Sequence, residues 1–275
     1  MLNLFKKEKI TDCKTKKQGI LINSFYKNDK LFCTLKVDNK KKIFVVNFYP
    51  YFYLATQSEL SKDNQEQIKD CLSLKQFEKI EKNNLRFCYK CVFNSVSELV
   101  SVRQKLLGSE INLNINYKIY EFDIPFIYRF FLDNDLSNFR LVEFYLNENN
   151  EIDSIIDLGK TDLQKLNTGC FDIEVLVSKN LAFPTPGKDK IISISYMDQY
   201  LNKNVFFLLE KSLDIKEKEK YSLEKTKVQF YENELDLING FLDFVEKEDP
   251  DIIYTYNGVF DFDYLQKAYI SHTKK

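Results

Sequence analysis

The stretch that most constrains the fold is Phe171-Asp172-Ile173-Glu174, because it places two carboxylates inside an apolar run from Cys170 to Val177. Side chains alternate between the two faces of a β-strand, so Asp172 and Glu174 point to the same side of a predicted strand. Neighbouring carboxylates repel each other and are costly to desolvate. A divalent cation between them removes that cost, and oxygen ligands suit Mg²⁺ or Mn²⁺. The alternative is a half-exposed strand whose acids lie in water.

The length and composition indicate a folded protein without membrane spans. A chain of 275 residues can bury a sizeable core and form two domains. Its 44% hydrophobic and 29% charged residues exclude a disordered chain. No apolar run reaches the roughly 18 residues of a membrane helix, and residues 1–10 lack the apolar core of a signal peptide. We therefore expect a cytoplasmic protein.

The charge is unevenly distributed although the net charge is only −1. Residues 1–130 hold 23 basic and 14 acidic side chains, a balance of +9. Residues 131–275 hold 17 basic and 27 acidic side chains, a balance of −10. This asymmetry favours a polyanionic partner for the first half and possible metal binding in the second. The alternative is an ordinary lysine-rich surface.

Two other kinds of chemistry have little support. Cys88 and Cys91 have the spacing of a zinc-binding pair, but no second pair or nearby histidine completes four ligands. Both lie in a predicted strand, where residues three apart point to opposite faces, so ordinary packed thiols are expected. His272 is the only histidine, which makes a Ser-His or Cys-His centre an unfavourable hypothesis.

Hydrophobic patterning predicts a β-rich first half. Strands are expected at 19–26, 30–37, 43–54, 85–93, 111–122, 141–146 and 152–158, and Pro50 would form a bulge or edge position in the third. Helices are expected at 60–72, 95–107 and 123–132. Ser95 and Glu98 have the spacing of a capping box. The polar residues 134–138 mark the expected boundary between domains 1–133 and 134–275.

The second half predicts a mixed sheet with helices on its faces. Strands are expected at 170–177, 190–198, 204–209 and 252–256, and helices at 233–247 and from 261 onward, with a charged connection at 211–227. Asp261 then follows the carboxyl end of a strand, where open α/β sheets place their chemistry. The alternative for Asp261 is a helix cap.

Taken together, these motifs resemble those of family-B DNA polymerases, most closely the archaeal branch. Phe171-Asp172-Ile173-Glu174 resembles the first exonuclease motif of the family, and Tyr256-Asn257-Gly258-Val259-Phe260-Asp261 resembles the second. Residues 190–196 look like the strand between them, and residues 48–51 and 120–126 with Arg129 look like parts of the N-terminal domain. The likeness runs from about Gly19 to the C-terminus.

The resemblance implies an α+β and α/β fold, in which a β-rich N-terminal template-binding domain precedes an RNase H-like 3′→5′ exonuclease domain. Asp172, Glu174 and Asp261 would hold two Mg²⁺ or Mn²⁺ ions, which activate water and stabilise the leaving 3′ oxygen. Asn257 and Phe260 would line the frayed 3′ strand of the DNA.

A second implication concerns a pocket for deaminated bases in the template strand. Its expected residues form a small apolar slot with two cations for the flanking phosphates: Tyr26, Pro50, Leu99, Arg103, Ile124, Phe126 and Arg129. The alternative is that Leu99, Ile124 and Phe126 are ordinary core residues.

The sequence also departs from the family pattern. Val175 stands where a hydroxyl residue is common, and one residue fewer than usual separates Asn257 from Phe260. The third exonuclease motif and the palm, fingers and thumb do not follow. We therefore expect the N-terminal and exonuclease part of a split or truncated polymerase, with DNA and a second polymerase chain as partners. The alternatives are a non-catalytic single-strand binding module that recognises deaminated bases and a stand-alone metal-dependent nuclease.

Overall fold

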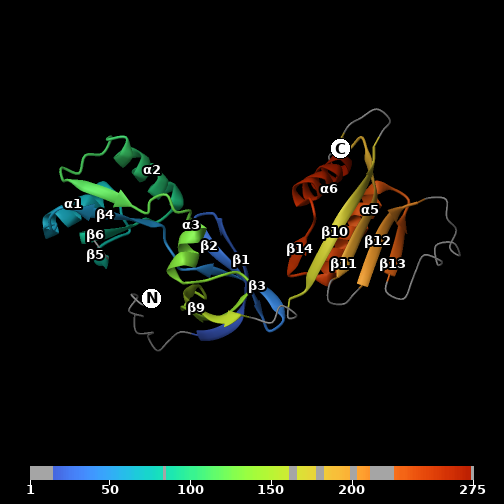
Figure 1. Ribbon diagram of the computed structural model, residues 1–275, viewed down its shortest axis with the longest axis horizontal. Coiled ribbons are helices and arrows are strands. Elements are labelled where there is room, and N and C mark those ends of the chain that lie inside the picture. Colours follow the sequence, from blue (N-terminus) through green and yellow to red (C-terminus); the bar gives the residue numbers. More distant parts are fainter. Residues whose placement is uncertain are drawn as a thin grey trace. The chain divides into compact units, whose positions relative to one another are not determined.

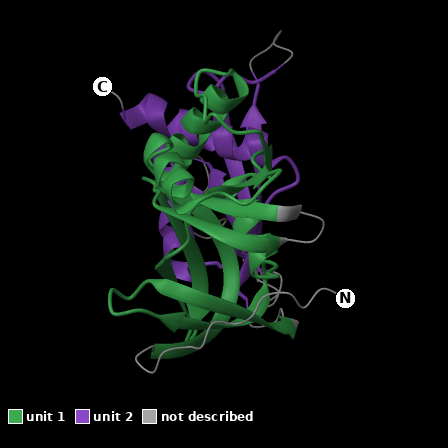
Figure 2. Cartoon of the chain, turned by 90° about the vertical axis from the view of Figure 1, so that its left-hand side faces the viewer, with its two compact units in different colours: residues 1–161 green, residues 162–275 purple. Residues whose placement is uncertain are grey.

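The computed structural model describes residues 15–82, 85–160, 166–177, 183–198, 203–210 and 226–273. The chain divides into two compact units, unit 1 with residues 1–161 and unit 2 with residues 162–275 (Figure 2). Among the described residues, no helix is both long and apolar enough to cross a membrane. The fold combines several sheets with short helices, as expected for an α+β protein.

The first part of unit 1 is a closed five-stranded barrel (Figure 1). Its strands, in the order β1-β2-β3-β9-β8, are β1 (Thr15–Lys27), β2 (Lys30–Val37), β3 (Lys40–Val46), β9 (Ile152–Lys160) and β8 (Arg140–Leu146). All neighbouring strands are antiparallel except β3 and β9, which are parallel. Leu21, Leu35 and Phe144 lie in the barrel core, where α3 (Phe126–Asp133) contributes Phe130.

The second part of unit 1 is a four-stranded sheet inserted between β3 and α3. Its order is β5-β6-β4-β7, and its strands are β4 (Tyr51–Thr56), β5 (Gln76–Lys82), β6 (Leu85–Val92) and β7 (Tyr117–Tyr120). The helices α1 (Lys62–Cys71) and α2 (Val96–Leu107) pack on one face through Ile68 and Leu99. Cys91 lies in that core and Cys88 in a separate cluster with Tyr51, so the two thiols are packed on opposite faces.

Unit 2 is a mixed five-stranded sheet with the order β13-β12-β11-β10-β14. Its strands are β10 (Thr168–Leu176), β11 (Lys190–Asp198), β12 (Lys203–Leu209), β13 (Thr226–Tyr231) and β14 (Ile252–Tyr254). Strands β10, β11 and β12 are antiparallel, whereas β14 runs parallel to β10 and β13 parallel to β12. The helices α5 (Glu234–Glu248) and α6 (Gly258–Thr273) share one core with this sheet, which includes Phe171, Phe241 and Leu265.

The structure differs from the sequence expectations in how the strands are divided. The single strand expected at 43–54 is two strands in different sheets, because the chain leaves the barrel after Val46 and enters the other sheet at Tyr51, directly after Pro50. The expected strand at 111–122 is only Tyr117–Tyr120. The expected boundary at 134–138 falls within unit 1, since β8 and β9 complete the barrel with β1 and β3.

Gly169 allows an unusually close approach between β10 and a buried tyrosine. A Cβ atom at this position would lie 1.9 Å from the Tyr196 hydroxyl oxygen and 2.3 Å from Cζ of the same ring. Tyr196 is buried in the core of unit 2, so the ring cannot swing into solvent. Only glycine therefore fits at this point of β10.

We expect Gly169→Ala to destabilise unit 2 by about 2 to 3 kcal/mol, because overpacking forces the backbone or the ring to move. Urea unfolding of the variant measures this loss. The double variant Gly169→Ala with Tyr196→Leu should lose less free energy of unfolding than the two single variants lose in sum, since the second change removes the clash. Strict additivity would contradict the proposed contact.

Candidate functional site

The carboxylates of β10 occupy the exposed face of the sheet of unit 2. Phe171 and Ile173 are buried in the core, while Asp172 and Glu174 point to the opposite face and are exposed. This is the alternation expected from a strand period of two. The pairing of β10 with β11 shifts register between Glu174 and Val175, so Glu174 lies at an irregularity of the strand. Such bulges re-aim side chains and are frequent beside functional sites.

The fold brings the start of α6 close to this strand. Strand β14 runs parallel to β10, and Tyr254 at the end of β14 is paired with Cys170. The chain then turns at Tyr256 and Asn257, and α6 begins at Gly258. Asp261 lies in the first turn of α6, where its backbone N–H donates to the Asn257 carbonyl at 3.0 Å.

The Asp261 carboxylate is buried without full compensation. Its side chain is only 2% exposed, and Oδ2 has no hydrogen-bond partner in the described part of the chain. Burial raises the pKa of Asp261, and the negative charge of Asp172 raises it further, while Thr255 and the backbone of Asn257 act in the opposite direction. A buried carboxylate oxygen without a donor is costly, and a bound cation would remove this cost.

Cys170 shares this environment with the two aspartates. It precedes Asp172 by two residues on β10 and therefore projects from the same face. Burial raises the pKa of the Cys170 thiol, and the charges of Asp172 and Asp261 add to the effect. The charge of Asp172 therefore acts on the pKa values of both Cys170 and Asp261.

The full predicted ligand set is not assembled in the structure. Within the described ranges, no three histidine, cysteine, aspartate or glutamate side chains come together in a way that could hold a metal ion. The joint role of Asp172, Glu174 and Asp261 as metal ligands thus stays a prediction. Of the two residues expected to line DNA, Asn257 is exposed, whereas Phe260 is partly buried and contacts the Tyr264 ring at a centroid distance of 5.4 Å.

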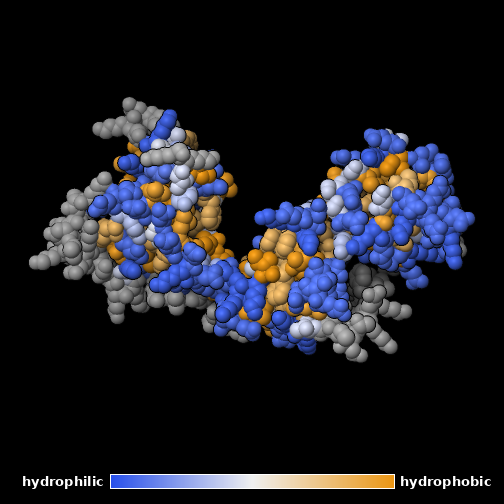
Figure 3. Space-filling model, turned by 180° about the vertical axis from the view of Figure 1, so that it is seen from behind, coloured by the Kyte–Doolittle hydropathy of each residue, from blue (hydrophilic) through white to orange (hydrophobic). Residues whose placement is uncertain are grey.

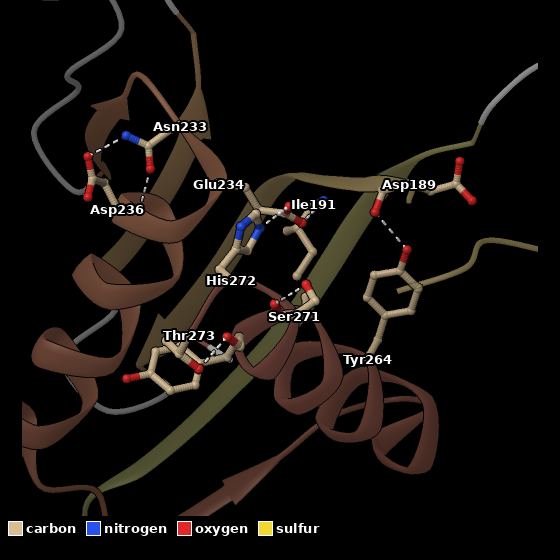
Figure 4. Close-up of polar contacts among 11 residues, drawn as sticks. Asp189, Ile191, Asn233, Glu234, Asp236, Tyr264, Ser271, His272 and Thr273 are labelled. Carbon is tan, nitrogen blue, oxygen red and sulfur yellow. Dashed lines mark hydrogen bonds and ion pairs between the residues drawn. The ribbon is translucent and has the colours of Figure 1, made fainter. Parts of the chain in front are cut away.

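The far end of α6 is tied to the rest of unit 2 by His272 (Figure 4). His272 Nε2 hydrogen-bonds to Oε2 of Glu234 at 2.7 Å, and Oε1 of this buried glutamate accepts the backbone N–H of Ile191 at 2.7 Å. The Tyr264 hydroxyl on α6 donates to the Asp189 carbonyl at 3.0 Å. These contacts join α6 to α5 and β11, and thereby fix the helix that carries Asp261.

Unit 1 contains a small cavity between α2 and the start of α3. Its volume is about 120 Å³. Six of the seven residues expected for the template pocket line it: Pro50, Leu99, Arg103, Ile124, Phe126 and Arg129. Tyr26 does not line the cavity, but its ring contacts Phe126 edge to face at 5.4 Å, and its hydroxyl accepts the Val96 N–H at 3.3 Å.

The two arginines of the cavity differ in what they contact. Arg103 is partly exposed and donates to the Phe122 carbonyl at 3.3 Å. Arg129 is only 4% exposed, and its guanidinium group binds the Glu121 carboxylate and donates to the Glu121 carbonyl at 2.7 Å. The same group lies over the Tyr51 ring, 4.7 Å from its centroid. Arg129 is therefore held by residues of unit 1, and its contact with a phosphate stays a prediction.

Comparison with known protein families identifies the chain. A profile described as DNA polymerase family B, exonuclease domain, matches residues 117–271, more than half of the sequence. The chain belongs to DNA polymerase family B. The match includes both acidic motifs and extends beyond unit 2 into the last third of unit 1.

Several relatives of the chain are archaeal DNA polymerases. The chain is 27% identical over 229 residues to a DNA polymerase of Thermococcus kodakarensis and 29% identical over 228 residues to one of Methanocaldococcus jannaschii. These matches cover 80% of this chain but only 11% and 12% of the relatives. The family B polymerase structure of Pyrobaculum calidifontis has the same fold, with a TM-score of 0.67 and 19% identity over 93% of this chain and 32% of that chain.

Some residues around the two sites of this family B chain were missed by sequence reasoning. Cys170 could have been found, because the strand period that pairs Asp172 with Glu174 also places Cys170 on their face. Thr255 and the residues that hold Arg129 carry no such signal. Tyr51 begins β4 and Glu121 directly follows β7, so the two residues are far apart in sequence and only the pairing of β4 with β7 brings them together.

Proposed function

We propose that unit 2 carries the acidic residues of a 3′→5′ exonuclease that removes nucleotides from a DNA strand with divalent cations. The observation that supports this most strongly is the buried Oδ2 of Asp261, which has no hydrogen-bond partner among the described residues and whose pKa is also raised by the charge of Asp172. A buried carboxylate near a second negative charge destabilises the fold without a cation, and a bound cation removes this cost. The family membership of the chain supports the same reaction.

The side chains have separate roles in this proposal. Asp172, Glu174 and Asp261 would hold Mg²⁺ or Mn²⁺, because hard carboxylate oxygens are the ligands that these ions prefer. When bound, the ions supply Lewis-acid stabilisation of the charge that develops on the phosphate. The exposed Asn257 would contact the 3′ strand beside them, and Phe260 would support the start of α6 through its contact with Tyr264.

Cation binding should stabilise the folded chain. At about one hundred times the dissociation constant, Mn²⁺ should raise the free energy of unfolding by about 2.7 kcal/mol, measured by thermal unfolding with and without EDTA. Asp261→Asn should remove most of this response. A full response in the variant would show that Asp261 is not a ligand.

Without metal, Asp261→Asn should stabilise the protein by about 1 kcal/mol near neutral pH, because it removes a buried charge. The pKa of Asp261 is raised in the folded state, so its stabilising contribution is lost as pH rises through that pKa. The advantage of the variant should therefore vanish near the ordinary aspartate pKa of 3.8 and below it. Unfolding in EDTA as a function of pH measures this difference.

We further propose that the cavity of unit 1 receives a single base of a DNA template strand. Its apolar lining and small volume suit one planar ring, and the partly exposed Arg103 would contact a neighbouring phosphate. The test compares binding of a single strand with one uracil and the same strand with thymine. Tighter binding of the uracil strand would support recognition of deaminated bases, and equal binding would contradict it. Arg103→Gln should weaken both strands equally, since phosphates carry no base identity.

A further inference from the structure

The connectivity of the barrel defines which of its faces is available for binding. The five strands form a closed barrel in the order β1-β2-β3-β9-β8, in which β3 and β9 are the one parallel pair. The helix α3 comes before β8, the fourth strand along the chain, and contributes Phe130 to the barrel core. This is the arrangement of an OB-type barrel. Barrels of this type bind oligonucleotides on the outer face of the second and third strands, between the loops that follow the first and fourth. In this chain the second and third strands are β2 and β3.

The outer face of β1, β2 and β3 carries a row of apolar side chains. Leu31, Cys33 and Leu35 point into the core, so Phe32 and Thr34 point outward. Strand register places Phe32 between Phe25 on β1 and Val45 on β3, and Thr34 beside Ile43.

The two phenylalanines form a ready stacking surface. Their rings are stacked, with centroids 5.1 Å apart and an interplanar angle of 11°. Ile43, in the next row, is 62% exposed. In the space-filling view, hydrophobic residues reach the surface among largely hydrophilic neighbours in several places (Figure 3). Aromatic rings on a strand face can stack on nucleic-acid bases of any sequence.

Lysines lie at both ends of this apolar row. Residues 15–46, which form the three strands and their turns, contain eight lysines and only two acidic residues. Lys36 on β2 is paired with Lys41 on β3, one row beyond Thr34 and Ile43. Lys27 and Lys30 flank the turn at the other end. Lys30 Nζ lies 3.9 Å from the Glu151 carboxylate, which brings the loop between β1 and β2 close to the loop between β8 and β9.

We propose that the outer face of β1, β2 and β3 binds single-stranded nucleic acid. Bases stack on the Phe25 and Phe32 rings and against Ile43, while Lys36 and Lys41 contact phosphates. The combination of an aromatic pair with an excess of lysine matches a flexible polyanion that exposes its bases, and does not match a purely apolar partner. This site is separate from the cavity and from the carboxylates, so it does not depend on the function proposed for either.

The test measures fluorescence anisotropy of a labelled oligo-dT of about 15 nucleotides with the full chain, at about 50 mM salt and in EDTA. EDTA removes the contribution of any metal centre, so a failure of the exonuclease proposal leaves this result unaffected. An oligo-U of the same length distinguishes RNA from DNA as the preferred strand. We expect measurable affinity that falls steeply with salt.

Three variants test the face itself. Phe32→Leu keeps an apolar side chain but loses the stacking ring, and should weaken binding by about tenfold. Ile43→Glu places a negative charge at an exposed position that the fold does not need, and should weaken binding at least as much. Lys36→Gln with Lys41→Gln should reduce the salt dependence of binding: the slope of log affinity against log salt concentration should become smaller in magnitude by about 1.4, because two phosphate contacts are lost.

The matched control is Lys62→Gln with Lys69→Gln on α1, which removes the same charge from exposed positions elsewhere in unit 1. It should leave the affinity within about twofold of the unchanged chain. Thermal unfolding of each variant separates lost binding from lost folding. Unchanged affinity in Phe32→Leu and Ile43→Glu, or an equal loss in the α1 control, would overturn the proposal.

Discussion

Asp172→Ala is expected to lower metal-dependent hydrolysis of a 3′ DNA end by at least about a thousandfold. Asp172 is an exposed carboxylate on β10 whose charge acts on both Asp261 and Cys170. In the proposed metal centre, its removal would leave the cation with one anionic ligand fewer. The ligands of a catalytic ion act as a unit, so the loss of one ligand lowers the rate far more than a proportional fraction. The measurement is the rate of shortening of a labelled single strand with Mn²⁺.

The control for this variant is Asp243→Ala, which removes an exposed aspartate from α5 in the same unit. It should change the rate by less than about twofold, since a surface charge away from the site has little influence. Equal rates for Asp172→Ala and the unchanged protein would place the nuclease centre elsewhere. A reaction that proceeds equally well in EDTA would contradict the role of a cation.

Arg129→Met is expected to destabilise unit 1 by about 3 kcal/mol, because it leaves acidic groups in a buried environment without their cation. Arg129 binds Glu121, and its guanidinium lies over the Tyr51 ring. The Tyr51 hydroxyl in turn donates to the Asp133 carboxylate at 2.6 Å. For a unit of this size the loss corresponds to a fall of about 6 to 12 °C in the unfolding temperature.

The effect of Arg129→Met should depend on pH. Burial raises the pKa of Asp133, and the nearby Arg129 partly opposes this rise. Without Arg129 the folded-state pKa rises further, so more stability is lost as pH increases through it. The deficit should therefore be larger at about pH 7 than at about pH 4, as measured by urea unfolding. A deficit that does not change with pH would show that Asp133 is not part of the network.

Arg140→Met provides the comparison for Arg129→Met. Arg140 donates to Asp157 at 3.0 Å, but its side chain is 34% exposed, so water can replace the lost partner. We expect a loss of about 1 kcal/mol or less. Similar losses for the two variants would contradict the view that burial, and not the ion pair as such, makes Arg129 important.

The sequence predicted the local parts of the acidic site because each depends on a short-range pattern. The strand period places Asp172 and Glu174 on one face, and the polar turn after β14 predicts Asp261 at the start of a helix. The geometry between these parts depends on the parallel pairing of β14 with β10, which joins residues more than eighty positions apart. No local pattern contains this information.

Two features of the fold differ from the sequence prediction for identifiable physical reasons. Strand β5 (Gln76–Lys82) is rich in charged residues, because it lies at the edge of its sheet and has little apolar alternation. The sequence predicts Pro50 as a bulge or edge position of one strand, whereas in the structure it precedes a change from one sheet to another. Hydrophobic patterning identifies a strand from its burial, but the choice of partner strand is a non-local property that patterning cannot reveal.

The insertion of the four-stranded sheet into the barrel has a consequence for the order of folding. The first three barrel strands emerge early in synthesis, but β8 and β9, which close the barrel, follow almost a hundred residues later. Contacts so distant along the chain form slowly, because the entropy of closing a long loop is lost before they are gained. The inserted sheet has its own core and can become compact while β1 to β3 still await their partners. During that interval the edges of β1 and β3 have no neighbour, which makes them the positions most exposed to wrong pairing in a nascent chain.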